Sequence, residues 1–129
     1  MNKAKRTVWI FCISAVIIIA ILFVIYLKTA SINLPEDKIV FYYGVTCPHC
    51  KNVEAYMIEV NASSILQVES KEVYLNETNA DELIKIGKFC KLQKDYVGAV
   101  PLAYYNGVCF LGDTPIIDFL KKKISEAER

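Results

Sequence analysis

The 129-residue chain has very little histidine, almost no net charge and only one closely spaced cysteine pair. His49 is its single histidine, so a metal site built on paired histidines is not possible. The formal charge is +1, and Lys and Arg do not cluster with aromatic residues on one predicted face, so we expect no nucleic-acid partner. With 54% hydrophobic residues, the composition is too apolar for a disordered chain.

The five cysteines stand at positions 12, 47, 50, 90 and 109. Structural zinc sites use four cysteines, or two cysteines with two histidines, and the single CxxC pair of Cys47 and Cys50 matches neither set. A c-type haem needs a histidine directly after the second cysteine, where Lys51 stands. We therefore predict no resident metal ion and no other cofactor.

Most of the apolar excess lies near the N-terminus. After a short basic tail, residues 1–7, a run of twenty residues at 8–27 carries no charge. As a helix this run is about 30 Å long, which matches the hydrocarbon core of a membrane. Trp9 and Tyr26 lie near its two ends, where amphipathic rings favour the headgroup level. The run predicts a transmembrane helix, in which Cys12 is an ordinary apolar-tolerant residue.

A cleaved signal peptide is the alternative interpretation of this run. The run is longer than a signal peptide's apolar core, and cleavage after Ala30 would place Lys28 where a small residue is expected. Three basic residues precede the helix (Lys3, Lys5 and Arg6), whereas only Lys28 follows closely. The positive-inside rule therefore predicts a single-pass protein with a cytoplasmic N-terminus and an extracytoplasmic remainder.

Residues 28–37 form a predicted linker, and residues 38–129 are long enough for one domain. Four strands are predicted, at 38–44, 68–76 (centred on 72–75), 102–105 and 108–111. Three helices are also predicted. The first begins at Cys47, the second at Asn79 with Glu82 as its capping partner, and the third at Asp113 or Thr114 with Pro115 as its first helical residue. The Asn106-Gly107 dipeptide predicts a type I′ hairpin between the last two strands. The order β-α-β-α-β-β-α predicts an α/β fold, a four-stranded mixed sheet with three helices.

The CxxC stretch stands between the first strand and an amphipathic helix. Pro48 fits the first helical turn, and the helix N-terminus would stabilise a Cys47 thiolate. Cys50, one turn later, could form the disulfide and resolve a mixed disulfide, while His49 would add a cation or donor beside the thiolate. These effects lower the expected pKa of Cys47 and make the disulfide more oxidising. For Cys47 and Cys50, the alternatives are a structural disulfide or two inert buried cysteines. For His49, the alternative is an exposed spacer that does not affect the thiolate.

The stretch Phe41-Tyr-Tyr-Gly-Val-Thr-Cys-Pro-His-Cys-Lys51, followed by an amphipathic helix, resembles proteins of the thioredoxin fold. Val100-Pro101, at the start of the third strand, matches the cis-proline position of that family. Gly112-Asp113, before the last helix, is similar to small glutaredoxin-like members. The resemblance covers residues 38–129 and implies a minimal thioredoxin fold.

The resemblance also implies roles. Cys47 would attack and Cys50 would resolve, cis-Pro101 would border the dithiol, and the Val100 backbone would pair with an extended substrate. An ordinary proline at a strand start is the alternative for Pro101. The Pro48-His49 dipeptide is similar to that of the periplasmic disulfide oxidant DsbA, although no DsbA-like helical insertion fits in this length.

Two features stay open at this point. Many family members carry a buried acid six residues before the nucleophile, where this chain has Phe41, so the proton acceptor for Cys50 could be Glu54 or water. In a thioredoxin-like layout, Cys90 and Cys109 come near each other at one end of the sheet. A structural disulfide there would contribute about 2–4 kcal/mol, and two separate buried thiols are the alternative.

Together these features predict a membrane-tethered thiol–disulfide oxidoreductase that exchanges disulfides with cysteine-containing extracytoplasmic proteins. An oxidant or isomerase is favoured, recycled by a membrane redox partner, and we expect a monomer. An envelope reductant is the nearest alternative. A metal-handling module that binds copper or zinc through the CxxC pair is a second, and a redox-inert peptide-binding adaptor is a third.

Overall fold

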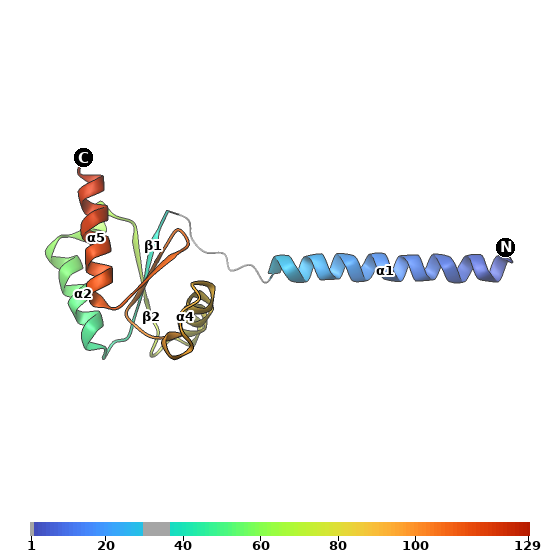
Figure 1. Ribbon diagram of the computed structural model, residues 1–129, viewed down its shortest axis with the longest axis horizontal. Coiled ribbons are helices and arrows are strands. Elements are labelled where there is room, and N and C mark those ends of the chain that lie inside the picture. The colour runs from blue at the N-terminus through green and yellow to red at the C-terminus, as the bar shows by residue number, and fades with distance from the viewer. Residues whose placement is uncertain (1, 30–36) are drawn as a thin grey trace. The chain divides into compact units, whose positions relative to one another are not determined.

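The computed structural model describes residues 2–29 and 37–129 (Figure 1). The chain divides into two compact units, residues 1–34 and residues 35–129. The predicted linker at 28–37 therefore lies mostly outside the described residues.

The first unit is one helix, α1 (Lys3–Thr29), which already begins within the stretch predicted as a basic tail. Its segment Val8–Tyr26 has a mean hydropathy of 3.2, and no part of the segment is buried within the structure. By length and composition, α1 is able to cross a membrane, as a signal sequence near an N-terminus would also be.

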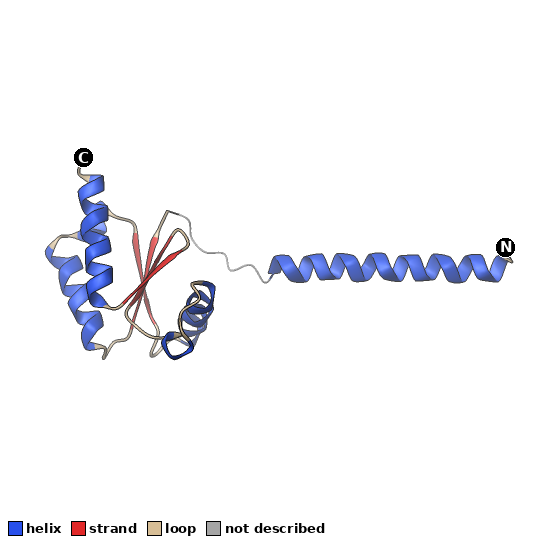
Figure 2. Ribbon diagram, viewed as in Figure 1, coloured by secondary structure: helices blue, strands red, loops and turns tan. Residues whose placement is uncertain are grey.

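The second unit is built on a four-stranded mixed sheet (Figure 2). The strands are β1 (Ile39–Tyr43), β2 (Val68–Glu72), β3 (Leu102–Tyr105) and β4 (Val108–Leu111), in the spatial order β2-β1-β3-β4. β1 and β2 are parallel, whereas β3 is antiparallel to both β1 and β4. The predicted mixed sheet is confirmed.

Helices cover both faces of this sheet (Figure 1). α2 (Pro48–Glu59) and α5 (Asp113–Ala127) lie on one face, and α4 (Glu77–Phe89) lies on the other. Because side chains alternate along a strand, Phe41 packs toward α2 and α5, while Tyr42 bonds to Glu82 of α4 through its hydroxyl at 2.7 Å. Burial within this sandwich keeps the pKa of Tyr42 well above its usual value, and the Glu82 carboxylate adds to the effect.

Two short elements were not predicted. α3 (Ala62–Ile65) and a 3₁₀ turn, η1 (Lys94–Tyr96), each span about one turn. A segment of that length is too short to show an amphipathic period, so the sequence pattern does not reveal it. The three predicted helices are present as α2, α4 and α5.

The segment between β2 and α4 differs from the prediction. The expected strand centre at 72–75 is wrong, because β2 ends at Glu72 and its carboxylate accepts hydrogen bonds from the backbone of Tyr74 and Leu75. The expected helix start at Asn79 is also wrong. Asn76 is the N-cap, accepting the Asn79 N–H at 3.1 Å, so α4 begins three residues earlier.

The last helix also starts earlier than predicted. Gly112, with φ of 93°, is the N-cap, and Asp113 is the first residue of α5. Pro115 is therefore third rather than first in the helix, a position whose N–H would still lack an intrahelical partner. The β3–β4 turn is as predicted, with positive φ values of 43° at Asn106 and 86° at Gly107.

Candidate active site

The Cys47–Cys50 pair lies at the N-terminus of α2. Cys47 is the N-cap, with extended backbone, and Pro48 is the first helical residue, as expected. The two cysteines are joined by a disulfide, with Cα atoms 5.2 Å apart, and the Cys50 N–H points at Cys47 Sγ at 3.1 Å. Cys47 is 6% exposed and Cys50 is fully buried, so Cys47 is the less enclosed of the two cysteines.

The Val100-Pro101 peptide lies beside this pair and is cis. Cys47 Sγ is 3.9 Å from the Val100 carbonyl oxygen, a long contact appropriate to sulfur. Among residues 37–129, nothing hydrogen-bonds to the Val100 N–H. The structure thus brings together Cys47, Cys50, Val100 and Pro101, and it leaves a backbone donor open beside Cys47.

His49 has a different partner from the one expected. The sequence placed its ring as a donor beside the Cys47 thiolate, but its Nδ1 lies 3.0 Å from Asp113 Oδ2 in α5. The side chain is 69% exposed. Asp113 also accepts the Asn52 amide at 2.7 Å and the Thr114 N–H at 3.0 Å.

Asp113 is therefore strongly held in its ionised form. The hydrogen bond from His49, followed by that from Asn52, lowers the pKa of Asp113 to about 2. From the sequence, Asp113 was expected as a helix-cap candidate and as part of the Gly112-Asp113 resemblance, with no contact to His49, and Asn52 was not expected at the site. Both lie on helix N-terminal turns near the CxxC stretch, which is the signal that could have pointed to them.

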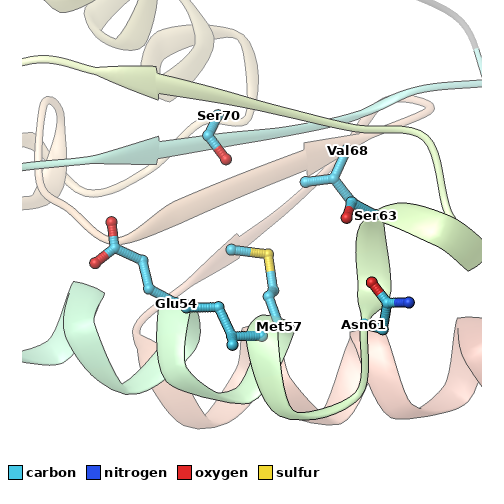
Figure 3. A pocket seen from close by; sticks show the side chains of 7 residues that line it. Glu54, Met57, Asn61, Ser63, Val68 and Ser70 are labelled. Atoms are coloured by element: carbon cyan, nitrogen blue, oxygen red, sulfur yellow. The ribbon is translucent and has the colours of Figure 1, made fainter.

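Apolar side chains surround the buried sulfur. Phe41 is 1% exposed and belongs to the same core cluster as Cys47 and Cys50. Among the described residues, no carboxylate is bonded to Cys50. Glu54 bonds to Lys51 at 2.7 Å and lines a pocket of about 430 Å³ between α2 and β2, together with Ser70 (Figure 3). The proton acceptor for Cys50 therefore stays open between Glu54 and water.

A second carboxylate, Glu72, holds together the two loops that flank this end of the sheet. It accepts the N–H groups of Val45 at 3.3 Å, Tyr74 at 2.8 Å and Leu75 at 2.8 Å. Desolvation opposes its ionisation, but these backbone donors outweigh it and lower the pKa of Glu72. The Tyr74 ring occupies the space that a side chain at Gly44 would need.

The clamped loops expose apolar side chains next to the CxxC stretch. Val45, two residues before Cys47, is 43% exposed, while Tyr74 and Leu75 are 53% and 82% exposed. The hydrogen bonds to Glu72 hold the backbone that carries these side chains. No sequence pattern indicates this surface, because it depends on a contact between loops 27 residues apart.

The second cysteine pair also forms a disulfide in the structure. Cys90, the C-cap of α4, is joined to Cys109 on β4, with Cα atoms 6.1 Å apart. This bond ties the end of α4 to an edge strand. The segment that it closes contains Val100-Pro101, so it also limits how far that peptide can move from Cys47.

Comparisons with known proteins address the fold. No family model matches the sequence, and no curated protein matches it. Among solved structures, the holo form of glutaredoxin C1 from Populus tremula x tremuloides is similar, with a TM-score of 0.53 and 15% sequence identity. The match covers 72% of this chain and 80% of that chain.

The fold is thioredoxin-like. The predicted fold class is thereby confirmed, together with the apolar N-terminal helix that precedes it. At 15% identity the likeness concerns the fold alone. Within this thioredoxin-like fold, a CxxC pair caps a helix and faces a cis-proline peptide. Residues 2–29 and 37–129 contain no group of three or more His, Cys, Asp or Glu side chains arranged to hold a metal ion.

Proposed function

We propose that the protein is a membrane-tethered thiol–disulfide oxidoreductase that acts on cysteine-containing proteins outside the cytoplasm. One observation carries the proposal: the less buried sulfur of a helix-capping CxxC pair lies 3.9 Å from the carbonyl oxygen of a cis X-Pro peptide, in a thioredoxin-like fold. An inert structural disulfide would not need an open backbone donor beside it.

The chemistry follows from the unequal burial of the two sulfurs. In the oxidising direction, a substrate thiolate attacks Cys47 Sγ, the Cys47–Cys50 bond breaks, and Cys50 leaves as a thiolate that takes up a proton. A second substrate thiolate attacks the substrate sulfur of the mixed disulfide, and Cys47 leaves as a thiolate. The substrate loses two electrons and gains a disulfide, while the protein becomes a dithiol.

The N-terminus of α2 favours Cys47 as the leaving group of the second step. The unpaired N–H groups of the first helical turn and the helix dipole stabilise a negative charge there. The Cys50 N–H, already 3.1 Å from Cys47 Sγ, is one such donor. The same stabilisation favours the dithiol and hence the oxidising direction.

We infer that the substrate binds as an extended peptide with apolar residues near its cysteine. The open N–H of Val100 could pair with its backbone. The exposed side chains of Val45, Tyr74 and Leu75 offer an apolar surface on the loop that leads to Cys47. This surface supports a protein substrate.

The direction of electron flow is the finer part of the proposal. The His49 motif and the inferred compartment favour an oxidant or isomerase, and an envelope reductant is the alternative. A midpoint potential near about −120 mV would exclude the reductant, and one near about −270 mV would exclude the oxidant. In either direction, we propose a membrane redox partner that recycles the pair, and a monomeric enzyme.

The decisive experiment uses the full chain in detergent micelles with a reduced, unfolded model protein. Disulfide transfer should occur, and Cys47→Ser should abolish it. With the disulfide-containing form of the same model protein, reduced Cys50→Ala should accumulate mixed disulfides: the Cys47 thiolate attacks the substrate disulfide, one substrate sulfur leaves as a thiolate, and no resolving thiol follows. Cys12→Ser is the matched control and should behave as the wild type. Stoichiometric tight binding of copper(I) without any disulfide exchange would instead favour the metal-handling alternative.

A further inference from the structure

The Asp113 carboxylate belongs to α5 but lies against the first turns of α2. Its Oδ2 is 3.0 Å from His49 Nδ1 and accepts the Asn52 amide at 2.7 Å, while its Oδ1 accepts the Thr114 N–H at 3.0 Å. His49 and Asn52 are the second and fifth residues of α2, and Cys47 is the N-cap of the same helix. The carboxylate is therefore fixed at the end of α2 that carries the reactive sulfur.

The hydrogen bond between Asp113 and His49 has a defined direction. His49 and Asn52 lower the pKa of Asp113 to about 2, so the carboxylate is ionised at neutral pH and can only accept. The proton of the bond consequently lies on His49 Nδ1. That N–H donates to Asp113 rather than to Cys47, and whenever the ring is cationic the carboxylate offsets its charge.

Few other charged groups bear on this corner. From α2, Lys51 and Glu54 are bonded to each other at 2.7 Å, and the two active-site cysteines carry charge only when reduced. From α5, Asp118 and Lys121 lie further along the helix and face each other at 3.9 Å. β4 and α3, which pack against α5, contain no charged residue. Asp113 is thus the ionised carboxylate that meets the first turns of α2.

We propose that Asp113 is a positioning residue that turns His49 away from Cys47 and places a fixed negative charge beside the thiolate site, making the disulfide a weaker oxidant than its motif alone predicts. The inference rests on the proposed function. Both effects have the same sign, because a nearby carboxylate repels a thiolate and an occupied imidazole N–H cannot donate to it. The Asp113 carboxylate therefore opposes the stabilisation that the N-terminus of α2 gives to a Cys47 thiolate.

The test measures the thiolate directly, in the reduced full-length chain in detergent micelles. The rate of Cys47 alkylation by iodoacetamide, followed across pH by mass spectrometry of the Cys47 peptide, gives the pKa of Cys47. Asp113→Asn should lower it by about 0.5–1 unit, which is a threefold to tenfold gain in thiolate at a given pH. The equilibrium constant with glutathione should shift by the same factor, which is about 15–30 mV toward a stronger oxidant.

Matched variants separate this effect from a general change of charge or of helix stability. Asp118→Asn removes the same charge from an exposed position on the same helix and should leave the Cys47 titration unchanged. His49→Ala should raise the pKa of Cys47, because the carboxylate then acts without any offset. Adding Asp113→Asn to His49→Ala should reverse that rise, but by less than the effect of Asp113→Asn in the wild type, because no imidazole N–H is then released toward the thiolate.

The tautomer of His49 provides a second measurement, which is unambiguous because the chain has one histidine. Nitrogen-15 shifts of the neutral ring should show a protonated Nδ1 in the wild type, and Asp113→Ala should remove this preference. A Cys47 titration that Asp113→Asn leaves unchanged would overturn the inference, as would additive effects of the two substitutions. Since these readouts need no protein substrate, they can fail while disulfide transfer by the wild type still succeeds, and the two proposals are distinguishable.

Discussion

At the N-terminus of α2, individual side chains decide how reactive each sulfur is. Cys47 caps the helix and borders Val100, whereas Cys50 lies beneath it, against Phe41 in an apolar environment. An apolar environment raises the pKa of a thiol, and a helix N-terminus lowers it. The environments of Cys47 and Cys50 therefore act on the two thiols in opposite directions, as the proposed attacking and resolving roles require.

The ionisation of Asp113 gives a prediction at this scale. His49→Ala or Asn52→Ala should raise the pKa of Asp113 from about 2 toward the ordinary value of 3.8, because each substitution removes a donor to the carboxylate. Carbon-13 NMR titration of the Asp113 carboxyl measures the change. Asp118 is exposed and serves as the internal reference.

The sign of the linked stability follows from the lowered pKa. Because the folded pKa of Asp113 is below the unfolded one, its ionised form favours the folded state above about pH 4. That contribution is lost as the pH falls from about 4 to about 2. In the Asn52→Ala variant the two pKa values lie closer together, so this pH-dependent contribution should be smaller and its loss complete at a higher pH. Acid unfolding monitored by circular dichroism would show it; identical acid transitions would contradict the assignment.

Glu72 gives a second prediction, about loop geometry. Glu72→Gln keeps the shape but replaces one acceptor oxygen with a donor, so one of the three N–H bonds to Val45, Tyr74 and Leu75 must be lost. We expect slower disulfide transfer to a protein substrate, with an unchanged rate toward a small dithiol that does not need the apolar surface. Glu69→Gln, on the same strand, is the control. Equal losses toward both substrates would show that Glu72 acts on the disulfide itself.

At the level of elements, the Cys90–Cys109 disulfide joins α4 to β4. Closing a loop of this length is expected to stabilise the fold by about 3 kcal/mol, mainly by restricting the unfolded chain. Cys90→Ala with Cys109→Ala should lower the free energy of unfolding by about 2–4 kcal/mol, measured by denaturant titration. The Cys12→Ser variant should unfold as the wild type does. A loss well below 1 kcal/mol would show that the bond does not form in solution.

For the whole molecule, the orientation of α1 is the main prediction. Its exposed apolar segment, Val8–Tyr26, would be unfavourable in water, so we expect it to insert in a bilayer with the thioredoxin-like unit on the extracytoplasmic side. An impermeant thiol reagent added to intact cells should label reduced Cys47 but not a cysteine introduced at Asn2.

Replacing Lys3, Lys5 and Arg6 by Gln should weaken this orientation. Labelling of position 2 alone would reverse the topology, and release of the mature domain would indicate a cleaved signal peptide.

Local patterns were sufficient to predict most of the fold. The Asn106-Gly107 turn, the helix beginning after Cys47 and the cis peptide at Pro101 each depend on neighbouring residues or on the family resemblance. The missed contacts join side chains distant in sequence: His49 and Asp113 are 64 residues apart. Such contacts exist only once helices have packed, so neither spacing nor composition reveals them. The prediction extended β2 past Glu72 for a related reason. Nothing in the sequence shows that the Glu72 carboxylate binds the backbone of the following loop and ends the strand.

The arrangement of the two disulfides has a consequence for how the chain matures. Four cysteines can pair in three ways. Here the two bonds join neighbours along the chain, Cys47 with Cys50 and Cys90 with Cys109, at separations of 3 and 19 residues. The two loops neither overlap nor enclose one another, so neither bond has to form before the other can close. During synthesis from the N-terminus, both cysteines of the first pair emerge before either cysteine of the second. Opening the Cys47–Cys50 bond does not require the Cys90–Cys109 bond to change. In the proposed function, the Cys47–Cys50 bond can therefore open and close while the Cys90–Cys109 bond stays in place.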